Sequence, residues 1–106
     1  MKGGVYINGE LAGFLEKTGS GKFEYRYEES YFLNPSKPSI SLSLSKRQQT
    51  YHSDHLFAFF QGLLAEGTNK DVQCRMLKID EKDDFSRLLL TAGDDTIGAV
   101  TVKALP

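Results

Sequence analysis

Short apolar runs separated by turn-forming residues fill the first 27 positions of the chain. Residues 5–7 and 11–15 are two such runs, and Asn8-Gly9 between them is the dipeptide that most readily forms a type I′ hairpin turn. Residues 23–27 alternate aromatic with charged side chains, so the three rings share one face of a strand. The pattern therefore predicts a meander of three antiparallel strands.

Serine alternates strictly with an aliphatic residue over positions 39–45. Successive side chains of a strand point to opposite faces, so Ile40, Leu42 and Leu44 would share one face and the four serines the other. We predict a fourth strand here, buried on its aliphatic side.

Beyond residue 53 the apolar residues recur at spacings of three and four, which is the spacing of amphipathic helices. The first predicted helix covers 53–67, with Ser53 as N-cap and Phe60 in its apolar face. A second runs from position 68 or 69 to about 77, and a third from Asp83 to a C-terminal glycine at position 93. β-Branched residues predict a last strand over 97–102.

The order of elements is strands, then helices, then one strand. This order favours an α+β fold with a largely antiparallel sheet over a doubly wound parallel sheet. The 106 residues are 40% hydrophobic and 25% charged, so residues 1–106 are expected to form a single domain. Such a chain is too small for a complete kinase, dehydrogenase or synthetase, which needs two lobes around a cleft.

Charge and cysteine content narrow the function further. Thirteen basic and fourteen acidic residues give a formal net charge of −1, so direct binding to nucleic acid is not expected. Cys74 is the single cysteine, which excludes an intramolecular disulfide and a cysteine-rich zinc site. No apolar run has the form of a secretory signal or a membrane span, so we expect a cytoplasmic protein without membrane contact.

Two motifs could in principle bind a ligand. Residues 19–22 (GSGK) are similar to part of a phosphate-binding loop, but a strand follows them where that loop needs a helix, so a hairpin turn is favoured over a nucleotide site. His52 and His55 could share a metal ion, yet no third ligand is evident, and two solvent-facing side chains are the favoured interpretation.

The remaining polar candidates have structural explanations of the same kind. The acidic stretch 80–84 lacks the spacing of a calcium loop and suits a helix N-terminus, although a cation site is the alternative. Asp94 and Asp95 could act as a carboxylate pair or could bond their own loop. Cys74 is expected to be an inert buried residue. We therefore expect neither catalytic residues, metal nor cofactor, and classify the chain as a non-enzyme.

Several motifs in order make the chain similar, over almost its whole length, to the N-terminal subdomain of HipA-type toxin kinases. The matching segments are 5–9 (VYING) with Gly13, 23–25 (FEY), 41–44 (SLSL), 59–67 (FFQGLLAEG), Asp84-Phe85 with Leu88-Leu89, and 93–95 (GDD) with 98–100 (GAV). The resemblance implies that the kinase core of this family would begin beyond Pro106 and is absent.

A free-standing copy of this subdomain resembles the HipS antitoxins of three-component HipB-HipS-HipT systems. The resemblance implies that the chain binds and restrains a HipT-like kinase toxin. It also implies a complex with a HipB-like DNA-binding protein, which carries the operator contacts. The alternative is a non-inhibitory docking or assembly subunit that bridges the kinase and its DNA-binding partner.

The predicted kinase-binding site is the turn between the first two helices, residues 65–69. It consists of Ala65, Glu66, Gly67, Thr68 and Asn69. A helix N-terminus offers free backbone amides, and Glu66 could pair with a cation of the kinase. The alternative is that Glu66 and Thr68 only end and cap helices. Relatives often have proline at the position of Ala65 and tryptophan at that of Thr68. An inhibition in which an aromatic side chain enters the kinase active site would therefore have no tryptophan to use in this chain.

Overall fold

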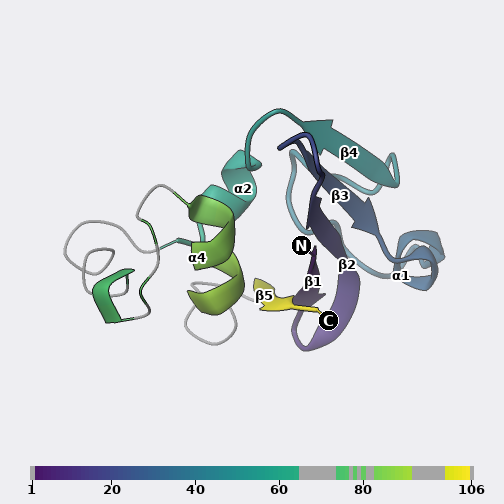
Figure 1. The fold of residues 1–106 in the computed structure, drawn as a ribbon. Helices are drawn as coiled ribbons and strands as arrows, with labels where there is room; N and C mark the ends of the chain where they lie inside the picture. Colours follow the sequence, from purple (N-terminus) through teal and green to yellow (C-terminus); the bar gives the residue numbers. More distant parts are fainter. Residues whose placement is uncertain are drawn as a thin grey trace.

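The computed structural model describes residues 2–64, 74–76, 78, 80, 83–91 and 100–105. Within these residues a five-stranded sheet is covered on one face by two helices, which lie side by side in Figure 1. The strands are β1 (Lys2–Ile7), β2 (Glu10–Lys17), β3 (Phe23–Tyr27), β4 (Thr50–Ser53) and β5 (Val100–Ala104). The helices are α1 (Glu29–Leu33), α2 (Ala58–Gln61) and α4 (Asp84–Thr91), and residues 74–76 are also helical.

All strand pairs are antiparallel, and the strand order is β4-β3-β2-β1-β5. The predicted α+β class with a largely antiparallel sheet is thus confirmed. The first strand lies inside the sheet, since β1 pairs with β2 along one edge and with β5 along the other. A further bond from the Leu105 amide to the Lys2 carbonyl (2.9 Å) continues the pairing toward the chain ends.

The predicted hairpin between β1 and β2 is present. Asn8 and Gly9 have φ angles of 51° and 82°, as a type I′ turn requires. The pairing register then shifts between Val5 and Tyr6, so that Ala12 is the extra residue of a β-bulge. Its carbonyl accepts a hydrogen bond from the Glu28 amide (2.8 Å), which ties the start of α1 to the sheet.

The core lies between the sheet and helices α2 and α4. Its fully buried side chains include Val5, Leu15 and Tyr25 from the sheet, with Phe60 from α2 and Leu88 from α4. Gly3 of β1 lies against the Leu89 side chain of α4. A β-carbon at that position would lie 2.6 Å from Cδ2 of Leu89, so a larger residue would force the Leu89 side chain to repack.

The predicted strand over 39–45 is wrong. Ile40 and Leu44 are buried, but Leu42 between them is 99% exposed, and the backbone turns at this point. The serines explain the difference, because their hydroxyls bond the backbone in place of a neighbouring strand. Ser41 Oγ accepts a bond from the Leu44 amide (3.1 Å), and Ser39 Oγ accepts one from the Lys46 amide (2.9 Å).

The predicted helix over 53–67 also needs correction. Ser53 ends strand β4, where it pairs with Phe23, and the helix begins only at Ala58. Residues 50–53 pair with β3, and this long-range pairing outweighs the local capping signal of Ser53. The prediction that Phe60 is a core residue is confirmed, since its ring is fully buried.

Other elements follow local signals more closely. Helix α4 begins where predicted, and Asp83 caps it by accepting a bond from the Ser86 amide (3.1 Å). Strand β5 matches the described part of the predicted strand, whose positions 97–99 lie outside the described residues. Of the second predicted helix, only residues 74–76 and 78 are described, with Cys74 buried in a helical turn.

Helix α1 was not predicted, and its cap makes stability dependent on pH. The Glu28 carboxylate accepts bonds from the amides of Ser30 (3.1 Å) and Tyr31 (3.0 Å). Bonding to the Ser30 hydroxyl and to these amides lowers the pKa of Glu28. A lowered pKa in the folded state contributes stability above the unfolded pKa, and that stability is lost as the pH falls through the folded pKa.

Glu28→Gln should therefore be less stable than the wild type at neutral pH, and the difference should shrink in acid. Urea unfolding of both proteins at about pH 7 and about pH 3 measures this change. A difference in unfolding free energy that stays constant between the two pH values would show that the Glu28 charge does not stabilise the cap.

Candidate partner-binding surface

The turn predicted to bind a kinase, residues 65–69, lies outside the described residues. The described chain that leads to it is anchored in the core. Helix α2 is held by buried Phe60, and Leu63 and Leu64 beyond it pack partly against the core. Leu64 is the last described residue before the predicted turn. The chain therefore reaches that turn from a well-anchored segment.

A hollow of about 380 Å³ lies beside α2 and is lined in part by Gln61. Its apolar lining consists of Leu56 and the ring pair Phe23 and Phe85, which meet edge to face with centroids 5.7 Å apart. Its charged or titratable lining residues are Lys17, Asp54, His55, Asp80, Asp83 and Asp84. Carboxylates outnumber lysine in this lining, so the hollow suits a cationic or hydrogen-bond-donating group of a partner.

Several of these carboxylates already have structural partners. Asp83 accepts bonds from the amide and hydroxyl of Ser86, and Asp84 pairs with Arg87, whose Nη1 lies 3.1 Å from Oδ1. Asp54 lies 3.4 Å from Lys22. These contacts orient the carboxylates, and each retains lone pairs for a further donor. Among the described residues, no three His, Cys, Asp or Glu side chains are grouped as metal ligands would be.

The two histidines are exposed, as the sequence indicated. His52 Nε2 lies 3.1 Å from a Glu24 carboxylate oxygen on the neighbouring strand, whereas His55 lines the hollow. The GSGK segment forms the turn between β2 and β3, where Gly21 has a φ of 81°. This confirms the predicted hairpin. Asp94 and Asp95 lie outside the described residues.

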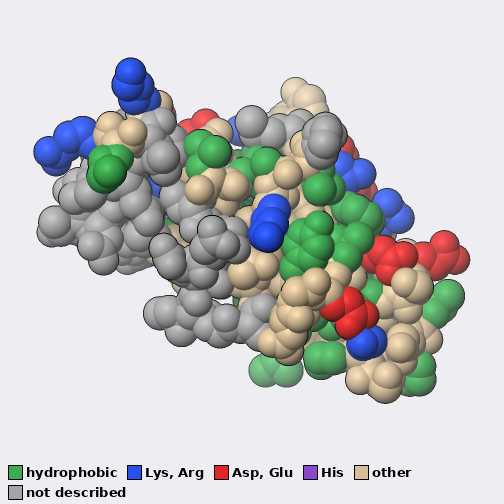
Figure 2. Space-filling view, turned by 90° about the horizontal axis from the view of Figure 1, so that it is seen from below, with side chains coloured by type: hydrophobic (Ala, Val, Ile, Leu, Met, Phe, Trp, Pro, Cys, Tyr) green, Lys and Arg blue, Asp and Glu red, His purple; other side chains and the backbone are tan. Residues whose placement is uncertain are grey.

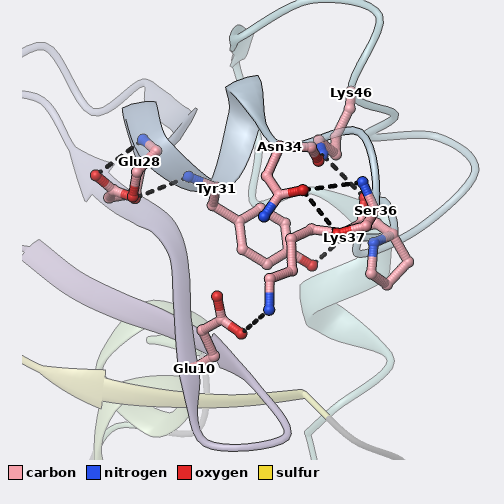
Figure 3. Close-up of polar contacts among 9 residues, drawn as sticks. Glu10, Glu28, Tyr31, Asn34, Ser36, Lys37 and Lys46 are labelled. Carbon is pink, nitrogen blue, oxygen red and sulfur yellow. Dashed lines mark hydrogen bonds and ion pairs between the residues drawn. The ribbon is translucent and has the colours of Figure 1, made fainter.

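A second surface feature, the loop of residues 34–46, was not predicted from the sequence. Figure 3 shows how polar contacts fasten its base. The Lys46 ammonium donates to the carbonyls of Asn34 and Lys37 and lies 5.2 Å from the Tyr31 ring centroid. Lys37 in turn pairs with Glu10 across 2.6 Å. The base of the loop is thus tied both to itself and to strand β2.

The upper part of the loop is fastened from the core by Tyr27. The Tyr27 hydroxyl accepts a bond from the Ile40 amide (3.0 Å) and donates one to the Leu44 carbonyl. Burial raises the pKa of Tyr27, so the hydroxyl keeps the proton that it donates. Tyr51 adds a bond to the Ser45 carbonyl (2.8 Å). We call residues 39–46 the serine loop, and Leu42 at its tip is 99% exposed.

A composition cue for this loop does exist in the sequence. Serine hydroxyls next to two prolines are typical of turns that satisfy their own backbone groups. The contribution of Tyr27 has no such cue, because the tyrosine lies 13 positions before Ile40. The serine loop is thus held in part by the distant side chains of Tyr27 and Tyr51, and Leu42 projects from it into solvent.

Charged side chains are mixed over the surface. In Figure 2, hydrophobic, basic and acidic side chains are interspersed over the described part of the visible face, and several acidic ones lie on the right, the side on which Figure 1 shows α1. This mixture agrees with the near-neutral composition. Among the described helices, none has the length and apolar composition needed to cross a membrane.

A family model and a solved structure indicate the same family. The family model described as the HipA N-terminal domain matches residues 4–103. A solved structure of the N-terminal domain of HipA toxin superimposes with a TM-score of 0.66 and 32% identity, covering 99% of this chain and 94% of that one.

Two curated relatives differ in length. A protein of Haemophilus influenzae, described as "Uncharacterized protein", is 37% identical over 101 residues, which cover 95% of this chain and 90% of the relative. A protein of Sinorhizobium fredii, described as "Putative kinase Y4mE", is 28% identical over 96 residues, covering 91% of this chain. The chain spans only 23% of that kinase-like relative.

Proposed function

The chain belongs to the HipA N-terminal domain family, and from this membership we propose that it acts as an antitoxin. In this role it binds a HipA-like serine/threonine kinase toxin of the HipT type as a separate chain and restrains it. A HipB-like DNA-binding protein joins them in a ternary complex and makes the contacts to DNA. In this proposal the chain itself contacts neither DNA nor a membrane, and it acts in the cytoplasm.

The observation that carries the proposal is the difference in length between the relatives. The same domain occupies 23% of a protein described as a kinase and 90% of a relative close to this chain in size. A surface that packs against the rest of a longer chain can serve as a docking surface for a separate chain, provided its complementarity is retained. Kinase binding is therefore the function that best fits the family.

The surface beside α2 fits such a role. The hollow is lined by carboxylates and by apolar side chains. Among the described residues, no group of three potential metal ligands is present. Carboxylates held by their own hydrogen bonds lose little conformational entropy when a lysine or arginine of a partner approaches. We propose that the predicted turn, residues 65–69, contacts the kinase, and that this hollow does so as well.

Co-expression with a cognate kinase tests the proposal. A kinase that arrests growth when expressed alone should permit growth when this chain is co-expressed, and an affinity tag on the chain should recover the kinase. A catalytically inactive kinase serves for the binding measurement, and Thr68→Arg in the predicted turn should weaken both binding and rescue.

The outcomes separate the proposal from its alternative. Binding without rescue would indicate a docking or assembly subunit that does not inhibit. Absence of binding to the cognate kinase would rule out both roles. Full binding and rescue by Thr68→Arg would remove the predicted turn from the interface while leaving the antitoxin function in place.

A further inference from the structure

The serine loop presents a single aliphatic side chain on a rigid support. Leu42 is 99% exposed, whereas its neighbours in the alternation, Ile40 and Leu44, are buried at 7% and 2% exposure. Single exposed leucines are common on protein surfaces and need no explanation by themselves. What distinguishes Leu42 is the number of contacts that hold the backbone on both sides of it.

Three side chains, those of Tyr27, Ser39 and Ser41, hold the backbone of the serine loop. The Tyr27 hydroxyl bonds the backbone at both Ile40 and Leu44, so the two positions that flank the tip are joined through one core side chain. Ser41 closes the turn onto the Leu44 amide, and Ser39 bonds the Lys46 amide. A side chain on such a support loses little backbone entropy on binding, which is the usual property of a preorganised anchor.

The charged residues near Leu42 in the sequence indicate the charge that a partner of the serine loop should carry. Residues 30–53 contain three basic residues, Lys37, Lys46 and Arg47, and no acidic residue. Lys37 is paired with Glu10, and the Lys46 ammonium donates to two backbone carbonyls and lies over the Tyr31 ring. Arg47 is exposed, so its charge is the most accessible of the three to a partner. Two copies of this loop would repel each other. A partner with carboxylates around an apolar pocket would attract it.

We propose that Leu42 is the apolar anchor of a second contact with the kinase, inserting into a hydrophobic pocket with an acidic rim. This inference rests on the proposed function. The relative described as a kinase supports this partner, because more than three quarters of its length lies outside the matched domain and can provide such a pocket within one chain. The serine hydroxyls beside Leu42 would face the polar rim of that pocket.

The test compares the effects on kinase binding of substituting two exposed leucines, Leu42 in the serine loop and Leu33 in α1. Leu42→Ser is expected to raise the dissociation constant for a catalytically inactive cognate kinase by at least about tenfold, because a buried leucine anchor is lost. Leu33→Ser changes the same residue type at a 68% exposed position of α1 and should alter binding by less than about twofold. Both variants should melt like the wild type, since neither side chain is in the core.

A third variant probes the acidic rim. Arg47→Glu should weaken binding at low ionic strength, and the loss should diminish as salt is added. Isothermal titration calorimetry measures all three dissociation constants, and light scattering measures self-association in the same samples.

Each outcome has a definite meaning. Wild-type binding with an unchanged constant for Leu42→Ser would overturn this inference and leave the proposed function intact. A wild-type chain that does not bind its kinase would overturn both. A concentration-dependent dimer that Leu42→Ser abolishes would assign the leucine to self-association and would also overturn the inference.

Discussion

Replacing Phe60 by aspartate is expected to unfold the domain. The Phe60 ring is fully buried and contacts Tyr25, Phe57 and Phe59, with ring centroids 5.8, 6.2 and 5.2 Å away. Removal of a buried phenylalanine side chain costs about 3 to 5 kcal/mol, and an unpaired carboxylate in the same place adds a desolvation penalty. Small domains are stable by about 5 to 15 kcal/mol, so the folded state would be lost.

Thermal melting followed by circular dichroism checks this expectation. Phe60→Ala should retain a cooperative transition at a lower temperature, and Phe60→Asp should show none. Leu42→Asp is the matched control, because it makes the same apolar-to-aspartate change at a position that is 99% exposed. Equal melting temperatures for the two aspartate variants would mean that α2 does not pack as described.

Substitution of Gly13 should produce the second largest loss of stability. A β-carbon at this position would lie 2.5 Å from the Arg26 carbonyl oxygen and 2.5 Å from the Tyr25 hydroxyl oxygen. Neither neighbour can easily move, because Arg26 is part of the β3 ladder and Tyr25 is fully buried. Overpacking of this kind costs about 1 to 3 kcal/mol for alanine and more for valine.

Urea unfolding of Gly13→Ala and Gly13→Val measures the effect. Gly19→Ala provides the control, since no atom lies within 4 Å of its added β-carbon and its φ is not left-handed. That variant should be neutral or more stable by up to about 1 kcal/mol, because alanine restricts the unfolded chain. Equal unfolding free energies for Gly13→Ala and Gly19→Ala would contradict the close approach of Tyr25 to strand β2.

The fold could be predicted from the sequence wherever a local signal agreed with its surroundings. The Asn8-Gly9 turn and the Asp83 cap are decided within a few residues, and both elements form as predicted. The serine loop and the start of α2 were predicted wrongly for the opposite reason. There a distant group, the Tyr27 hydroxyl or strand β3, offered the backbone better partners than its neighbours in sequence did.

The candidate surface shows the same division. Residues 65–69 remain a prediction drawn from a family resemblance. The hollow beside α2 combines Lys17, Asp54 and Asp83 from three separate segments, so no local motif indicates it. The exposure of Leu42 was hidden by a perfect alternation with serine, a pattern that a strand and a self-bonded loop can share.

The pairing of β1 with β5 has a consequence for synthesis on the ribosome. Ile7 of β1 pairs with Val100 of β5. One edge of β1 therefore stays unpaired until the ribosome has synthesised β5, more than 90 residues later. At roughly 5 to 20 residues per second this interval lasts several seconds. During that time the nascent chain carries an unpaired edge that can capture another extended segment. Chaperone protection of this edge, or a faster translation rate, is therefore expected to raise the yield of folded protein.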